Sequence, residues 1–232
     1  MQAQDTSTFF FFKLWPWVEA NLKRIGIGAG IAVAAAFLIS FYFWQQDQKE
    51  IAAGRAFTQL IVSTPPDTSA SQLADLYLQI ANEYPGTRAA QRALLQGATV
   101  LFAAGRYADA QTEFQKSLDA HPDGQFSGQA ALGVAASLEA QGKTDLAARA
   151  YQGVINGFDD PMAADRAKFA LARIYESQGK VSDALNFYED VASVNPNNSL
   201  GSEANARVMK LKAKLPPASS ATAPSDLFNV SH

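Results

Sequence analysis

Apolar side chains recur with helical spacing through the middle of the chain. Alanine, an aromatic residue and an aliphatic residue follow one another at steps of four, as in Ala110, Phe114 and Leu118. Steps of four place side chains on one face of an α-helix, where alanine allows close approach and the ring fills the gap to a neighbouring helix. The same spacing returns in Ala147, Tyr151 and Ile155. The pattern predicts amphipathic helices that pack against one another.

The pattern returns at an interval of 37 residues. Aromatic, glycine and alanine positions all keep this interval. The columns are Tyr77, Phe114, Tyr151 and Tyr188; Gly105, Gly142 and Gly179; Ala98, Ala135 and Ala172; and Ala110, Ala147 and Ala184. Several columns in phase indicate that one supersecondary unit is stacked repeatedly, and such stacks present an extended binding surface.

Each unit has the pattern of two helices joined by a tight turn. Three units run from about 88 to 122, 127 to 159 and 164 to 196. Their turns read GRYAD, GKTDL and GKVSD in that order, and the glycine of each turn ends the first helix of its unit. Turn-forming residues in PGT, HPDG, DDP and NPNNS separate the units. The sequence therefore predicts an all-α solenoid of helical hairpins, with the extra length of the repeat either in the turns between units or in longer helices.

The solenoid is expected to extend beyond these three units. A half-degenerate unit precedes them, with Tyr77 in phase and a first helix near Phe57 that begins soon after Trp44. Residues 199–215 are expected to close the stack, because the last hairpin otherwise exposes its apolar face. We assign residues 45–215 to this repeat domain with its capping helix, and the proline-rich residues 216–232 to a disordered tail.

The twenty residues from Ile25 to Trp44 carry no charge. As a helix they match the ~30 Å hydrocarbon thickness of a bilayer, which predicts a single transmembrane helix. Lys23 and Arg24 precede it, so residues 1–24 are expected to form a cytoplasmic leader and the repeats to lie across the membrane. A cleaved signal peptide is the alternative, although its apolar core is usually shorter.

Small residues lie four apart within this apolar segment, at Gly26, Gly30 and Ala34. Such spacing allows two membrane helices to approach closely, so these three residues are candidates for a helix–helix contact through which the chain would self-associate. The alternative is that the residues reflect only the general frequency of small residues in membrane helices.

The composition limits the chemistry that the chain can perform. A net charge of -3 without a basic cluster gives no reason to expect nucleic-acid binding. There are no cysteines, and the only histidines are His121 and His232, so we predict no metal site, no cofactor and no catalytic residues. No phosphate-binding or nucleotide-binding motif is present, and the sequence favours a binding protein over an enzyme.

The first helices of stacked hairpins line the concave face of a solenoid, where partners bind. Their mixture of charged and apolar side chains suits an extended peptide or a helix of a protein partner. The alternative for each residue is an ordinary solvated position. The residues predicted to face the concave side are Arg92, Leu95, Gln96, Thr99, Gln129, Leu132, Glu139, Arg166, Phe169, Arg173 and Glu176.

The repeats resemble the tetratricopeptide repeat family. The matching positions are Ala98, Gly105, Tyr107, Ala110, Phe114 and Pro122 in one unit and Ala172, Tyr175, Gly179, Ala184, Tyr188 and Pro196 in another. The period of 37 exceeds the usual 34, Thr144 and Asp159 depart from the middle unit's pattern, and the early tryptophan is missing. The resemblance implies a non-enzymatic scaffold. The family's clamp for acidic carboxyl-terminal peptides is not matched, because Leu95, Thr99, Gln129 and Gly133 occupy that region.

The layout of the whole chain is similar to that of the bacterial ancillary SecYEG translocon subunit family. The similarity lies in the segments VEANLKRIGIGAG and FYFWQQDQ, followed by about three and a half repeats. It implies a single-pass protein of the bacterial inner membrane whose periplasmic repeats contact the Sec translocon or periplasmic chaperones. The alternatives are a scaffold for outer-membrane protein assembly, cell division or pilus biogenesis, and an envelope enzyme with a degenerate site.

Overall fold

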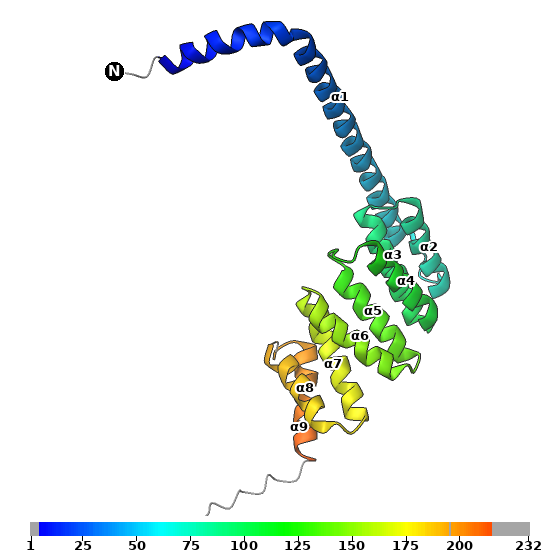
Figure 1. Ribbon diagram of the computed structural model, residues 1–232. Coiled ribbons are helices and arrows are strands. Elements are labelled where there is room, and N and C mark those ends of the chain that lie inside the picture. The colour runs from blue at the N-terminus through cyan, green and yellow to red at the C-terminus, as the bar shows by residue number, and fades with distance from the viewer. Residues whose placement is uncertain (1–4, 195, 215–232) are drawn as a thin grey trace, which may run out of the picture. The chain divides into compact units, whose positions relative to one another are not determined.

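The computed structural model describes residues 5–194 and 196–214, with side chains from residue 17 onward. Every regular element in this part of the chain is an α-helix, which confirms the all-α part of the predicted fold class. Leu215 and the predicted disordered tail, 216–232, lie outside the described residues. The helices are α1 (Asp5–Ser63), α2 (Ala70–Glu83), α3 (Arg88–Ala103), α4 (Tyr107–Ala120), α5 (Ser127–Ala140), α6 (Thr144–Gly157), α7 (Pro161–Ser177), α8 (Val181–Val194) and α9 (Ser199–Lys212) (Figure 1).

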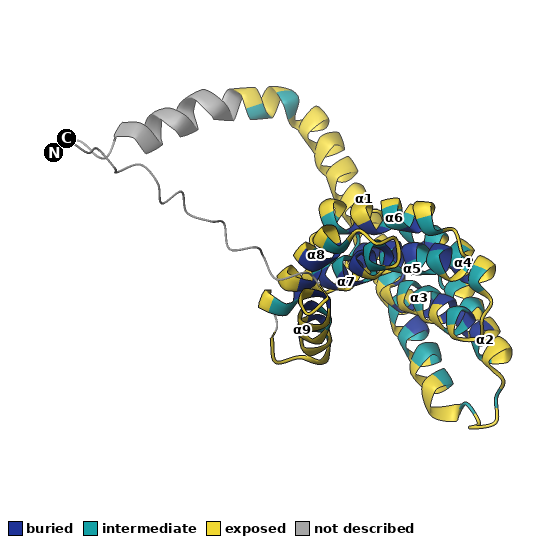
Figure 2. Cartoon of the chain, turned by 90° about the horizontal axis from the view of Figure 1, so that it is seen from below, coloured by how far each residue is buried: buried dark blue, intermediate teal, exposed yellow. Residues whose placement is uncertain are grey.

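The chain forms two compact units, Met1–Ala56 and Phe57–His232. In the first, α1 includes the whole apolar segment, and every residue from Ile25 to Trp44 is exposed (Figure 2). One stretch of the described chain, Trp17–Ser63, is long and apolar enough to cross a bilayer, a property that signal sequences share. Helix α1 continues past Trp44 to Ser63 without interruption, as the short interval before the first repeat predicts.

The second unit is a stack of helical hairpins. Helices α3 and α4, α5 and α6, and α7 and α8 form three antiparallel pairs, and α9 packs on α8 at the end. Among the first helices of the pairs, α5 contacts both α3 and α7 directly. This order agrees with the predicted solenoid and its closing helix, although α9 ends at Lys212.

The glycine of each hairpin turn adopts a left-handed backbone conformation. Gly105, Gly142 and Gly179 have φ angles of 77°, 76° and 74°. The following residue donates its N–H to a carbonyl five positions back, as from Arg106 to Leu101 at 3.0 Å. These are the bonds of a Schellman helix end, which glycine adopts without the steric penalty of a side chain. The 37-residue glycine column is thus a column of helix stops.

The third hairpin begins earlier than the sequence pattern indicates. We expected DDP to be a turn and the helix to start near residue 164, whereas α7 starts at Pro161. Asp160 caps it by accepting a hydrogen bond from the backbone N–H of Ala163 at 3.0 Å. Proline is favoured at the first helical position, where its missing N–H would have no partner, so here it begins a helix. The extra length of the repeat lies in α3 and α7, which have 16 and 17 residues against 14 in α5, and in the connection 121–126.

Alanines and rings of the 37-residue columns form the core between the hairpins. The alanines of both columns, from Ala98 to Ala184, are 0% exposed, and Tyr151 and Tyr188 are buried with them. Buried positions gather where successive helices face one another (Figure 2). Three apolar clusters result, one for each hairpin with its neighbour. The aromatic column therefore packs the hairpins together, as its spacing predicts.

Gly133 in α5 lies directly against the ring of Phe114. A Cβ atom added at Gly133 would come within 2.6 Å of three ring carbons, whereas one added at Gly153 in α6 would meet nothing within 4 Å. We expect Gly133→Ala to lower the free energy of unfolding by about 1 kcal/mol, because overpacking outweighs the gain in helix propensity. Gly153→Ala, the matched control, should raise it by about 0.5–1 kcal/mol. Urea denaturation followed by circular dichroism measures both, and shifts of the same sign would contradict the prediction.

Candidate partner-binding groove

Helices α3, α5 and α7 together line a groove on the inner side of the solenoid. It consists of two pockets, of about 520 and 330 Å³, which share Phe102, Leu132, Ala136 and Arg166. Because the shared residues lie on all three helices, the two pockets form one continuous groove. The larger pocket adds Glu139, Ala140, Tyr151, Phe169, Ala170, Arg173 and Leu200, and the smaller adds Leu95, Thr99, Phe114, Gln129, Gly133 and Met162.

Most of the residues predicted to face the concave side line this groove or the next pocket along the stack. That further pocket, of about 450 Å³, lies between α7 and α9 and includes Arg173, Glu176 and Arg207. The exceptions are Arg92 and Gln96, which are exposed on α3 and line none of the three pockets. The predicted residues that line them are Leu95, Thr99, Gln129, Leu132, Glu139, Arg166, Phe169, Arg173 and Glu176.

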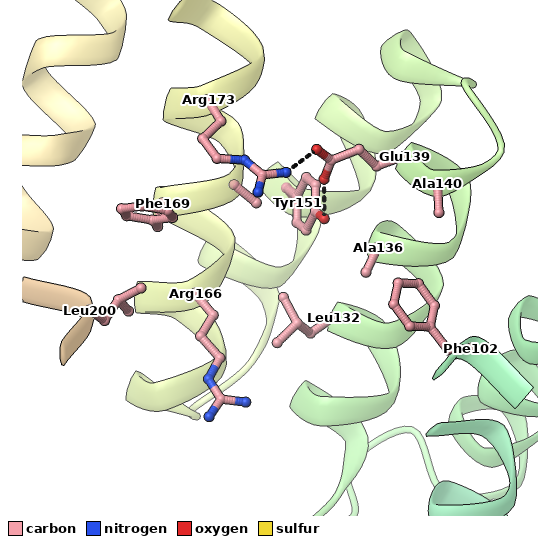
Figure 3. A pocket seen from close by; sticks show the side chains of 11 residues that line it. Phe102, Leu132, Ala136, Glu139, Ala140, Tyr151, Arg166, Phe169, Arg173 and Leu200 are labelled. Atoms are coloured by element: carbon pink, nitrogen blue, oxygen red, sulfur yellow. Dashed lines mark hydrogen bonds and ion pairs between the residues drawn. The ribbon is translucent and has the colours of Figure 1, made fainter. Parts of the chain in front are cut away.

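The groove has aromatic walls and a floor of small side chains. Phe102 approaches from α3 and Phe169 from α7, with Leu132 and Ala136 of α5 between them (Figure 3). Phe169 is 8% exposed, and its ring packs edge-on against Tyr188 at 5.3 Å between centroids. Phe169 is therefore both a groove wall and a core residue. Short side chains on α5 keep the middle of the groove open to an incoming apolar group.

A polar cluster closes one end of the groove. The Tyr151 hydroxyl donates a hydrogen bond to Glu139 at 2.7 Å, and the Arg173 guanidinium donates to the other oxygen of the same carboxylate. The three side chains come from α6, α5 and α7 (Figure 3). Burial, followed by the hydrogen bond to Glu139, raises the pKa of Tyr151 well above its usual range. The cluster therefore holds a neutral phenol and a neutralised ion pair.

The same arrangement recurs one repeat later. Tyr188 donates to Glu176 at 3.0 Å, and Arg207 of α9 lies 3.4 Å from that carboxylate. Both tyrosines are twelve residues after their glutamates, and the two glutamates are 37 apart. One repeat earlier, Phe114 and Phe102 occupy the tyrosine and glutamate positions. The inner face is therefore apolar towards α3 and carries paired charges towards α9.

Arg166 differs from the other cation of the groove. It lies on α7 where the two pockets meet and is exposed. Arg173 is paired with Glu139, whereas the described residues supply no ion-pair or hydrogen-bond partner for the Arg166 side chain. Its guanidinium points away from the Glu139–Arg173 pair (Figure 3). A positive charge therefore stands beside apolar walls without a counter-charge from the described chain.

Some residues of the groove were missed from the sequence. Phe102, Ala136 and Tyr151 line it but were not among the predicted binding residues, and Arg207 lines the next pocket. The glutamates at an interval of 37, each followed by an in-phase tyrosine, were the available signal. Sequence spacing does not identify the arginine that pairs with each glutamate, because Arg173 comes from the following hairpin and Arg207 from the closing helix α9.

The described residues contain no cluster of three or more side chains suited to hold a metal ion.

Gly26 and Gly30 of α1 have open space around them, with no atom within 4 Å of an added Cβ. Ala34 is exposed on the same helix. Self-association through this helix stays a prediction.

Two models of known protein families match the chain. A model described as a tetratricopeptide repeat-like domain matches residues 16–154, and a tetratricopeptide repeat model matches residues 166–198. Neither describes an enzyme. No curated protein matches the chain significantly.

Solved structures of low sequence identity are similar to this chain. A tetratricopeptide repeat protein of Parabacteroides merdae is 12% identical with a TM-score of 0.52, covering 72% of this chain and 61% of its own. A putative kinesin light chain of Podospora anserina is 12% identical with a TM-score of 0.50, covering 73% and 85%. The type III secretion translocator chaperone SycD of Yersinia enterocolitica is 20% identical with a TM-score of 0.47, covering 54% and 85%. Because the first family model spans more than half of the sequence, the chain belongs to the tetratricopeptide repeat-like family, whose fold typically serves as a non-enzymatic scaffold for protein interactions.

Proposed function

We propose that this protein is a membrane-anchored scaffold that binds protein partners through the groove on α3, α5 and α7. The observation that carries the proposal is a groove with apolar walls in a repeat fold that offers its inner face to partners. Exposed apolar surface rimmed by charged residues is typical of interaction sites. Phe102, Leu132 and Phe169 supply the apolar walls.

The anchor in this proposal is the segment Ile25–Trp44 of α1. Its side chains are exposed along the whole segment, which is unfavourable in water and favourable in lipid. The match to the family domain begins at residue 16, so the segment falls within the matched region. Lys23 and Arg24 orient residues 1–24 towards the cytoplasm of a bacterial cell and the repeats towards the periplasm.

Within the bacterial envelope, we propose the Sec translocon and its periplasmic chaperones as the partners. The support is the layout of a short leader, one apolar helix and about three and a half repeats, which resembles the ancillary translocon subunit. A tether of this kind would hold the groove close to polypeptides as they emerge from the membrane. The second candidate is a scaffold for another envelope assembly, such as outer-membrane protein insertion, cell division or pilus biogenesis.

The test is site-specific crosslinking in living bacteria with the full-length chain. A photoreactive amino acid at Leu132 in the groove should trap defined partners. The same group at Gln152, an exposed residue of α6 outside the groove, is the control. Translocon subunits or periplasmic chaperones trapped only at Leu132 support the first candidate, and components of another envelope assembly support the second. Identical crosslinks at both positions would contradict a binding role for the groove.

A further inference from the structure

We infer that the groove selects an apolar peptide segment carrying one aspartate or glutamate, whose carboxylate binds Arg166. This inference rests on the proposed function, because it assumes that the groove takes a peptide. It goes further by assigning the chemistry of the segment and the residue that recognises it.

The apolar requirement follows from the lining of the groove. Phe102 of α3, Leu132 and Ala136 of α5 and Phe169 of α7 all line the larger pocket, so a side chain that enters meets hydrocarbon from three helices (Figure 3). Half-buried Leu95 and exposed Met162 continue this surface into the smaller pocket. A polar side chain placed between these walls would lose its water without gaining a hydrogen bond, which disfavours it. Leucine or phenylalanine side chains of a partner fit this surface.

The acidic requirement follows from the balance of charge. Glu139 neutralises Arg173 at one end of the groove, and Glu176 and Glu203 neutralise Arg207 beyond it. Arg166 has no such partner among the described residues, although it borders both pockets. Its guanidinium presents several donors that match a carboxylate in geometry as well as charge. A segment that places an acid beside its apolar residues therefore complements the whole groove.

Arg166 can recognise this carboxylate without reorganisation of the existing ion pairs. Glu139 already accepts hydrogen bonds from both Tyr151 and Arg173, so it is not available to compete for Arg166. A basic peptide residue at the same place would face an unpaired cation and be repelled. Charge at this position thus discriminates between segments that are equally apolar.

The experiment measures peptide binding to the full-length protein in lipid nanodiscs. The probes are three fluorescein-labelled octapeptides of identical leucine and phenylalanine content that differ only in a central aspartate, asparagine or lysine. We expect the aspartate peptide to bind about fivefold more tightly than the asparagine peptide, and the lysine peptide to bind most weakly. Fluorescence anisotropy gives the three dissociation constants.

Substitutions at Arg166 decide whether this residue is the source of the selectivity. Arg166→Gln should make the affinities of the aspartate and asparagine peptides equal. Arg166→Glu should make the lysine peptide the tightest binder. Arg92→Gln, which removes an exposed cation of α3 outside the pockets, should leave the wild-type order unchanged. If the Arg166→Glu variant binds the three peptides in the same order of affinity as the wild type, the inference is overturned.

Failure of the inference can be separated from failure of the proposed function. If the three peptides bind equally and Leu132→Asp weakens all of them, the groove binds peptides but Arg166 does not select among them. If no peptide binds while crosslinks at Leu132 still trap defined partners, the assigned peptide chemistry is wrong and the scaffold function stands.

Discussion

Replacement of Tyr188 by alanine is expected to lower the free energy of unfolding by about 3–5 kcal/mol, the range for removing a large buried ring. Tyr188 is 0% exposed and lies in the cluster formed by α7, α8 and α9. Its ring packs against Phe169, and its hydroxyl donates to Glu176. The substitution would leave a cavity between the last hairpin and its closing helix, remove the edge-on ring contact and leave Glu176 with one partner fewer.

Urea denaturation followed by circular dichroism measures this effect, and hydrogen exchange locates it. Because each repeat contacts only its neighbours, loss of protection should concentrate in α7, α8 and α9. Tyr107→Ala removes a half-buried tyrosine of α4 and is the matched control, with a smaller expected loss. Equal losses for the two variants would contradict the assignment of Tyr188 as a principal packing residue.

Tyr188→Phe separates the ring from its hydroxyl. It should cost about 1 kcal/mol, the usual contribution of one hydrogen bond. Burial, followed by the hydrogen bond to Glu176, raises the pKa of Tyr188 in the folded state above its ordinary value of 10.0. The unfolded chain therefore loses this proton first, and the hydroxyl's contribution to stability is complete below about pH 10 and declines at higher pH. The phenylalanine variant should show a shallower alkaline loss of stability than wild type.

Much of the solenoid could be predicted from the sequence because its determinants are local. The glycine column predicts where helices end, because glycine adopts the left-handed backbone conformation found at Gly105. The alanine and aromatic columns predict which helix faces pack together. The start of α7 was placed wrongly, because Pro161 can either end a turn or begin a helix. The side chain of Asp160, which caps the helix, decides between these outcomes.

The charge pattern of the groove could not be predicted in the same way. Arg166 and Arg173 lie on one helix and have the same chemistry, yet Arg173 is paired and Arg166 has no partner among the described residues. The difference depends on Glu139, which lies 34 residues before Arg173 and reaches it only because α5 and α7 are neighbours. Contacts between hairpins thus decide which charge remains for a ligand.

The repeat is also less uniform than its period indicates. Tyrosine and glutamate occupy equivalent positions in two hairpins, and phenylalanines replace both of them in the hairpin of Phe102 and Phe114. The polar pair adds a directional bond between helices, while the phenylalanine pair leaves apolar surface at the α3 side of the groove. A regular packing scheme therefore carries an irregular binding surface.

Two arginines in the middle of the apolar segment, Val33→Arg with Phe37→Arg, are expected to release the protein from the membrane. Each arginine near the bilayer centre costs about 2.5–3.5 kcal/mol on the scale derived from helix insertion. Together the two charges remove enough insertion free energy to reduce the membrane-bound fraction severalfold or more. The residues are four apart and exposed on one face of α1, so the change disturbs no packed core of the described chain. The measurement is the fraction of protein in the membrane pellet after an alkaline carbonate wash.

Gln45→Glu with Gln48→Glu adds the same number of charges just beyond the segment and should leave the protein in the pellet, because acidic residues outside a span have little effect on insertion. The intact mass of the wild-type protein from the pellet should include residues 1–24, since an anchor is retained and a signal peptide is removed. Wild-type protein that lacks these residues and appears in the soluble fraction would contradict the anchor. A double-arginine variant that stays in the pellet would instead place membrane attachment elsewhere in the chain.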